Sequence, residues 1–216
     1  MLDEAGSHSW NARTTAEEIL ANHNLAEKLI VITGGSGGIG LAAAQAFAEV
    51  ESAAQAIAAC SRGGAVIAHE LDLMAQASVC HFAGQIGALD RPVDVLLANA
   101  GIVGPLERSL DDINFERREY RPFLSYGQSK TASILLAVTL ANSWRENGVD
   151  AFSLHPGTIM TEVARSLRRE DFREAKQRGA VTPADQTKNL EQGASTSIWA
   201  SIEPSLRGRG PLYLED

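Results

Sequence analysis

Short apolar runs alternate along the chain with longer segments in which apolar residues recur every three or four positions. The clearest runs are residues 29–33, 93–98 and 149–154, each mostly apolar and each followed within three residues by glycine. Such runs are typical of strands buried inside a parallel sheet. Weaker strand candidates are residues 65–71 and 212–214.

Helical periodicity accounts for most of the segments between these runs. The strongest predicted helix covers residues 125–147, and Gly148 is predicted to end it in the left-handed conformation. A second helix is predicted from residue 39, since steps of three and four turn one apolar face toward a core. Its apolar positions are Ile39, Ala43, Phe47, Val50, Ala54 and Ile57. Shorter helices are predicted over residues 16–23, 79–86, 162–178 and 189–201, and a charged loop over residues 104–124.

Strands that alternate with helices predict an α/β fold with a parallel sheet and right-handed crossovers. The chain has 216 residues, of which 44% are hydrophobic. At this length a folded chain buries roughly 70% of its unfolded surface, so one sizeable core is possible. We therefore expect a single domain, in which residues 1–13 form a frayed start.

The charge balance argues against nucleic acid or an anionic membrane as a partner, because both require clustered basic residues. Asp and Glu number 27 against 19 Lys and Arg, which gives a formal net charge of -8. Cys60 and Cys80 lack the spacing of metal ligands or of a disulfide framework, so we expect no metal site. The sequence shows neither a basic-then-apolar leader nor an apolar run of the ~20 residues that a spanning helix needs. We expect a cytoplasmic protein without a transmembrane segment.

The first motif that carries chemistry is the glycine-rich stretch over residues 33–40, Thr-Gly-Gly-Ser-Gly-Gly-Ile-Gly. It lies between a predicted strand and a predicted helix. Glycines allow a sharp turn and a close approach to a pyrophosphate, whose negative charge then faces the helix N-terminus. This context favours a nucleotide site over the alternative, a plain tight turn.

Two further motifs follow along the chain. Asn99-Ala100-Gly101 comes directly after a predicted strand, where open α/β sheets bind their ligands. Tyr126 and Lys130, four positions apart, lie one turn apart on the same face of the long predicted helix. A nearby ammonium favours the phenolate, so we expect Lys130 to lower the pKa of Tyr126 from its ordinary value near ~10. Such a tyrosine can exchange a proton with an alcohol or carbonyl group.

In this combination and order, the motifs resemble those of the short-chain dehydrogenase/reductase family: T-G-x-x-x-G-x-G, N-A-G and Y-x-x-x-K. The likeness covers nearly the whole chain, and residues 126–132, 153–159 and 212–216 are most similar to the retinol-dehydrogenase and WW-domain-oxidoreductase branch. The resemblance implies a Rossmann-type, doubly wound parallel sheet flanked by helices, with fewer strands than the family norm. It also implies one NAD(P)-binding domain over residues 1–216.

The family's functional residues map onto this chain through those motifs. Tyr126 would be the catalytic acid/base, and Lys130 would hold the nicotinamide ribose and lower the pKa of the tyrosine. The implied reaction is hydride transfer between NAD(P), with NADP slightly favoured, and an alcohol or carbonyl substrate. Asp72 would reach the adenine. The implied cofactor-binding residues are Thr33, Gly34, Ser36, Gly38, Ile39, Gly40, Asp72, Asn99, Ala100, Gly101, Lys130, Pro156, Gly157, Ile159 and Thr161.

Two pieces of the family pattern are missing from the sequence. The strand that selects NAD or NADP should end about 20 residues beyond the glycines, where this chain has alanine-rich helical sequence. The family's long helix and the strand ending in the catalytic serine do not fit between Asn99 and Tyr126. Neither Ser109 nor Ser125 follows a strand, so we assign neither that role. In family strand names we expect the order 3-1-4-6-7.

Three functions remain open from the sequence. The first is a working oxidoreductase acting on a small alcohol or carbonyl compound, which the branch suggests is lipophilic. The second is a catalytically impaired nucleotide-binding or interaction protein, and the third is a truncated relative that folds poorly. The long helix over residues 125–147 is a candidate homodimer interface. His155, at a strand end before Pro156 and Gly157, is expected to make a structural hydrogen bond.

Overall fold

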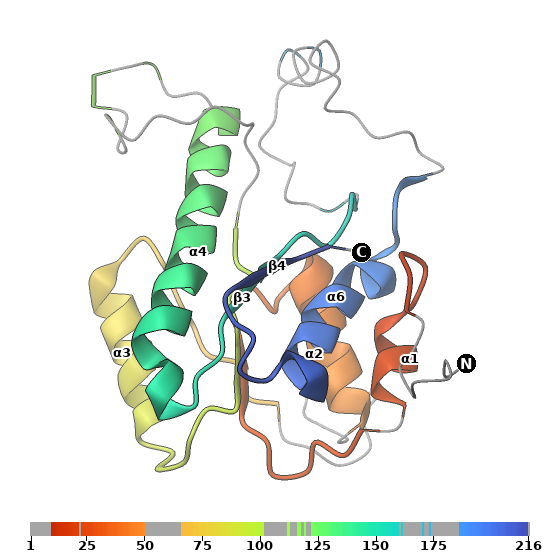
Figure 1. Ribbon diagram of the computed structural model, residues 1–216. Helices are drawn as coiled ribbons and strands as arrows, with labels where there is room; N and C mark the ends of the chain where they lie inside the picture. The colour runs from red at the N-terminus through yellow and green to blue at the C-terminus, as the bar shows by residue number, and fades with distance from the viewer. Residues whose placement is uncertain are drawn as a thin grey trace. The chain divides into compact units, whose positions relative to one another are not determined.

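The computed structural model describes residues 10–21, 23–50, 66–101, 122–159 and 186–215, with residues 112, 116, 117, 119, 161, 170 and 173. The chain divides into two compact units (Figure 1). The glycine-loop unit is Glu17–Ala100. The tyrosine unit combines Met1–Ala16 with Gly101–Asp216.

The glycine-loop unit is built on one pair of parallel strands. β1 (Ile30–Ile32) pairs with β2 (Val95–Leu97), with Ile30 opposite Val95 and Ile32 opposite Leu97. α2 (Gly38–Val50) follows β1, and it buries Ala43 and Phe47 as its apolar spacing predicts. α1 (Ala16–Leu20) begins at the unit boundary and buries Ile19 and Leu20. α3 (Gln76–Gly87) confirms the helix predicted over residues 79–86.

The strand predicted over residues 65–71 is wrong for the residues that the structure describes. Residues 66–71 belong to neither a helix nor a strand, and the side chain of Ile67 is 65% exposed. The apolar run there is only four residues long before His69 and Glu70, so it has little surface to bury. Without a ladder partner, those few side chains do not offset the entropy of ordering the backbone.

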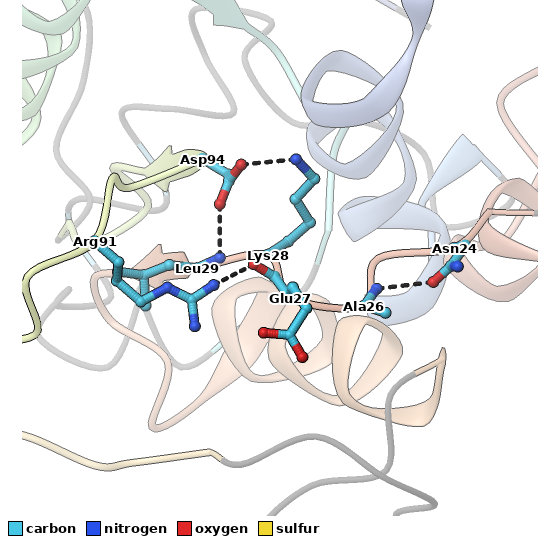
Figure 2. Close-up of polar contacts among 7 residues, drawn as sticks. All are labelled: Asn24, Ala26, Glu27, Lys28, Leu29, Arg91 and Asp94. Carbon is cyan, nitrogen blue, oxygen red and sulfur yellow. Dashed lines mark hydrogen bonds and ion pairs between the residues drawn. The ribbon is translucent and has the colours of Figure 1, made fainter.

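A polar cluster ties the start of β1 to the start of β2 (Figure 2). One carboxylate oxygen of Asp94 accepts an ion-paired hydrogen bond of 2.8 Å from the Lys28 ammonium. The other accepts the Leu29 backbone N–H at 2.9 Å, and Arg91 donates to the Glu27 carbonyl. The bond from Lys28, followed by that from Leu29, holds the pKa of Asp94 below its ordinary value. This cluster fixes the register of two strands that are more than 60 residues apart in sequence.

The tyrosine unit contains the second parallel pair. β3 (Phe152–Leu154) lies beside β4 (Leu212–Leu214), with Phe152 opposite Leu212. α4 (Pro122–Trp144) packs on β3 and buries Ala137 and Ala141. The 3₁₀ helix η1 (Arg145–Asn147) continues it to Gly148, whose φ of 76° confirms the predicted left-handed stop.

The C-terminal part of this unit also follows the sequence prediction. α6 (Leu190–Ile202) begins at Asn189, whose side chain accepts the Gln192 N–H while the Gln192 side chain accepts the Asn189 N–H. This capping box satisfies N–H groups that the first turn of a helix leaves free. η4 (Pro204–Leu206) then leads to β4. The helix predicted over residues 162–178 falls almost wholly outside the described residues.

The two strand pairs agree with the neighbours 1-4 and 6-7 of the expected strand order, in family names. In the described part of the chain, every helix is too short or too polar to cross a membrane. Division into one folding domain or two stays a prediction, as does the extent of any frayed start before residue 10.

We expect Asp94→Asn to lower the free energy of unfolding by about 1 kcal/mol at pH 7, because one charge-assisted bond is lost. The folded-state pKa of Asp94 is depressed, so its contribution is present above the unfolded pKa and is lost as the pH falls through the folded pKa. Urea unfolding at pH 7 and pH 3 measures both effects. Asp90→Asn, an exposed carboxylate on the same loop, is the control. An equal loss for Asp94→Asn at both pH values would contradict this account.

Candidate functional site

The glycine loop over residues 33–40 connects β1 to α2 and is held against the end of β2 by hydrogen bonds. The Thr33 N–H donates to the Leu97 carbonyl at 3.0 Å, and the Ala100 N–H donates to the Thr33 hydroxyl at 3.1 Å. The side-chain amide of Asn99 donates to the Thr33 carbonyl at 3.1 Å and to the Gly34 carbonyl at 3.4 Å. Thr33, Gly34, Asn99 and Ala100 therefore form one connected cluster, as the two motifs predict.

Two of the glycines are required by the space around them. A Cβ atom on Gly40 would collide with the Asn99 side-chain nitrogen and the Gly34 carbonyl oxygen. A Cβ on Gly34 would lie 2.9 Å from the Ala100 Cα, and the φ of Gly34 is +69°. Gly38, with a φ of +58°, is the first residue of α2. By contrast, a Cβ on Gly37 would meet nothing within 4 Å.

The loop has the features of an anion site at a helix N-terminus. α2 has 13 residues, and the backbone N–H groups of its first turn point toward the loop. Ser36 and Gly37 are exposed, whereas Gly38 and Ile39 are partly buried and Gly40 is buried. An exposed loop backbone at the start of a helix is the kind of site at which the pyrophosphate of a dinucleotide binds.

Asp72 has a local role in the structure. Its carboxylate accepts the Met74 N–H at 2.8 Å, and its own N–H donates to the Ser78 hydroxyl at 3.0 Å. Both bonds shape the turn that leads into α3. Because residues 66–71 form no strand, Asp72 does not follow the end of a sheet strand as we expected.

Tyr126 and Lys130 lie one turn apart near the start of α4, and both are partly buried. The Lys130 Nζ lies 5.3 Å from the centroid of the Tyr126 ring, so the ammonium contacts the ring face. Ser125 precedes Tyr126 on α4 and points about 100° away around the helix. Ser109 lies outside the described residues.

The expected effect of Lys130 on Tyr126 is wrong in this structure. Burial, followed by the charge of Tyr213, raises the pKa of Tyr126 above its ordinary value. Burial likewise lowers the pKa of Lys130. Desolvation opposes the charged form of each group, and the Lys130 ammonium lies over the ring of Tyr126. Tyr126 is therefore a neutral phenol at neutral pH.

The segment after β3 carries the last group of predicted residues. The His155 N–H donates to the Leu214 carbonyl at 3.0 Å, and its ring Nδ1 accepts the Gly157 N–H at 3.1 Å. This confirms the structural bond expected of His155 and shapes a turn in which Gly157 has a φ of +84°. Pro156, Ile159 and Thr161 are partly buried.

One contact to this segment escaped the sequence analysis. The Lys188 N–H donates to the Thr158 carbonyl at 2.9 Å, and Lys188 forms a parallel bridge with Ile159. The Lys188 side chain is buried. A backbone bridge between residues 29 positions apart leaves no periodic signal, so only the structure reveals it. Within the described residues, no cluster of His, Cys, Asp or Glu could hold a metal ion.

The comparisons with known proteins agree with the motifs. The sequence model of the short chain dehydrogenase family matches residues 28–120. A "Probable oxidoreductase" of Streptomyces antibioticus is 31% identical over 260 residues, covering 89% of this chain and 86% of the relative. The WW domain-containing oxidoreductase of Gallus gallus is 25% identical over 279 residues, covering 96% and 66%. The structure of NADPH-bound carbonyl reductase from chicken fatty liver is similar in fold, with a TM-score of 0.58 at 16% identity, covering 87% of this chain and 92% of that chain.

The alignments include many positions at which the relative has a residue and this chain has none. For the Streptomyces relative, 260 aligned positions include 89% of 216 residues, so about 68 positions have no counterpart here. This number of positions is about what two missing segments would contain, if each held one strand and one helix. Their positions, after α2 and after Asn99, stay a prediction.

We expect Gly40→Ala to lower the free energy of unfolding by about 1–3 kcal/mol, because Asn99 and the Gly34 backbone must move apart. Gly37→Ala is the matched control, since its methyl group enters open space, and its effect should stay within about 0.5 kcal/mol. Chemical unfolding of both variants measures the difference. Equal stabilities would show that the loop is not packed as described.

Proposed function

Because the chain belongs to the short-chain dehydrogenase family, we propose that it is an NAD(P)-dependent reductase of a carbonyl compound in which Tyr126 is the proton donor. Oxidoreductases of this family use NAD(P) to act on small-molecule substrates. The observation that carries the role of Tyr126 is the partly buried Tyr126–Lys130 pair on α4. It occurs in the family order after the glycine loop and the Asn99–Ala100 turn.

The cofactor is proposed to bind at the glycine loop and at the segment after β3. The fit rests on the N-terminus of α2 and on the close packing of Gly34 and Gly40 against Asn99 and Ala100, which the absence of a Cβ atom allows. When bound, the nicotinamide supplies or takes up the hydride. The proposed contacts are those named from the sequence: Thr33, Gly34, Ser36, Gly38, Ile39, Gly40, Asn99, Ala100 and Gly101 toward the diphosphate, and Lys130, Pro156, Gly157, Ile159 and Thr161 toward the nicotinamide. Asp72 is retained as a weaker proposal for the adenine, because its carboxylate is engaged at the α3 turn.

The protonation state of Tyr126 favours reduction at neutral pH. A neutral phenol can donate its proton to a carbonyl oxygen as that oxygen gains negative charge. The raised pKa keeps the proton on Tyr126 until the pH exceeds the ordinary phenol value of about 10. Lys130 lies beside the ring, with its Nζ 5.3 Å from the ring centroid, and its proposed role is to hold the nicotinamide ribose, as the family motif implies.

Further proposals concern the choice of cofactor, the substrate, the location and the oligomeric state. NADP is favoured over NAD only by analogy with the NADPH-bound carbonyl reductase of similar fold. A lipophilic substrate and a cytoplasmic location follow from the branch that the sequence resembles. A homodimer is proposed through α4, on which Leu135, Leu136 and Trp144 are each more than half exposed. The comparisons do not favour the alternative of a nucleotide-binding protein without catalysis.

We expect NADPH or NADH at about 100 times its Kd to raise the free energy of unfolding by ~2.7 kcal/mol, because the ligand binds only the folded chain. Thermal unfolding with each of the four nicotinamide nucleotides measures the shift and selects the cofactor. Gly84→Ala, whose methyl group enters open space on α3, should keep the shift, and Gly40→Ala should lose most of it. A cooperative transition that none of the nucleotides moves would contradict the proposed site.

We expect Tyr126→Phe to reduce carbonyl turnover by about 10²–10⁴-fold while nucleotide binding is unchanged, because only the proton donor is removed. The reduction rate of the unmodified chain should stay level through neutral pH and fall only above about pH 10. Tyr213→Phe, which removes the same atom from β4, is the control. Steady-state reduction of a panel of ketones and aldehydes measures the turnover of both variants and the pH profile of the unmodified chain. The thermal shift with the nucleotide measures binding. Equal turnover by Tyr126→Phe and the unmodified chain would sink the assignment.

A further inference from the structure

The segment before α1 is folded into a compact turn. The Asn11 side chain accepts the Arg13 N–H at 2.9 Å, and the Thr14 hydroxyl accepts the Asn11 N–H at 3.0 Å. The Thr14 N–H returns a bond of 2.9 Å to the Asn11 carbonyl, and Thr14 is buried. These bonds form a local turn over residues 11–14, and Arg13 is part of that turn.

Arg13 joins this turn to the N-terminus of α6 by two bonds. Its guanidinium Nη1 donates to the Thr187 carbonyl at 3.2 Å. Its own carbonyl accepts the side-chain N–H of Gln192 at 3.2 Å. Gln192 is the residue that completes the capping box with Asn189, so Arg13 contacts both sides of the α6 cap.

The same cap holds the segment that follows β3. Lys188 lies between Thr187, which Arg13 binds, and Asn189, which caps α6. The Lys188 N–H bonds to the Thr158 carbonyl at 2.9 Å, and its bridge partner is Ile159. Residues 155–158 lie outside every helix and strand, so the bridge at Ile159 adds a constraint on their backbone beyond the bonds of His155.

We propose that Arg13 is a positioning residue that sets the Thr158–Ile159 backbone, and so the pocket for the nicotinamide ring, through the Thr187–Lys188 segment. The inference rests on the proposed function, in which Ile159 meets the nicotinamide half of the cofactor. Arg13 touches neither cofactor nor substrate. Its guanidinium binds the carbonyl of Thr187, and the next residue, Lys188, binds the Thr158 carbonyl through its backbone N–H. Loss of the Arg13 bond removes one restraint from the Thr187–Lys188 dipeptide, and a shift of the dipeptide moves the Thr158–Ile159 backbone that it holds.

The chain offers a matched control in Arg145. Arg145 also binds backbone carbonyls of the same unit, donating to Gly208 at 3.1 Å and to Gly210. Those carbonyls precede β4, whereas Thr158 follows β3. Because β3 and β4 are parallel, the two arginines act at opposite ends of one strand pair. Arg13→Ala and Arg145→Ala therefore remove similar bonds, but only the first lies next to the proposed pocket.

The experiment compares binding of the preferred nicotinamide nucleotide with binding of ADP-ribose or its 2′-phosphate, which lack the nicotinamide. For Arg13→Ala we expect the dinucleotide Kd to rise about 3–12-fold, as the loss of one such bond implies, and the ADP-ribose Kd to change less than about twofold. Arg145→Ala should leave both Kd values within about twofold. Arg13→Lys, which keeps one donor for the Thr187 carbonyl, should recover part of the dinucleotide affinity.

Amide hydrogen exchange tests, without any ligand, whether Arg13 holds the Thr187–Lys188 segment in place. The Lys188 N–H, bonded to Thr158, should exchange faster in Arg13→Ala and at its original rate in Arg145→Ala. If Arg13→Ala fails to fold, Arg13→Lys with the same two measurements replaces it. An unchanged Lys188 exchange rate in Arg13→Ala, or an equal loss of affinity for dinucleotide and ADP-ribose, overturns the proposed role of Arg13 but leaves the proposed function standing. Failure of the unmodified chain to bind any nicotinamide nucleotide overturns the proposed function itself.

Discussion

Both units depend on hydrogen bonds from side chains to the backbone at the ends of very short parallel strands. A three-residue ladder has too few backbone bonds to define its own register. In the glycine-loop unit, Asp94 binds the backbone at the start of β1 and Asn99 binds the loop at its end. In the tyrosine unit, the Asp150 carboxylate binds the N–H groups of Gly208 and Gly210 before β4. The side chains at the strand ends thus replace ladder length as the source of register.

The two ends of the strands are built differently, and the difference bears on function. The N-terminal ends are fixed by charged groups: Lys28 and Asp94 in one unit, Arg145 and Asp150 in the other. The carboxyl ends lead into glycine turns at Gly34 and Gly157, both with positive φ. A glycine turn leaves backbone groups uncovered by side chains, which is what a ligand with a diphosphate requires. The rigid ends hold the strands in place so that the open ends keep one shape.

Local sequence signals predicted the elements that local chemistry determines. Helical spacing found α2, α3, α4 and α6, Gly148 marked the stop of η1, and the glycine pattern located the loop over residues 33–40. The strand over residues 65–71 failed because a strand needs a partner, which no local pattern reports. The pKa of Tyr126 failed for a related reason, since burial and ring-face contact depend on packing. Arg13 and Lys188 were missed because they act through backbone carbonyls and N–H groups, which every residue possesses.

The surplus of about 68 positions in the Streptomyces relative bears on how this chain keeps a nucleotide site. In the glycine-loop unit, Leu96 on β2 is 62% exposed and α3 buries none of its side chains. Exposed apolar surface of this kind leaves part of the usual hydrophobic stabilisation unrealised, at roughly 25 cal/mol per Å². A bound dinucleotide adds stability in proportion to the logarithm of its concentration over its Kd. A chain that lacks about 68 of the aligned positions has fewer residues with which to bury surface, so we expect a bound dinucleotide to supply a larger share of its total stability.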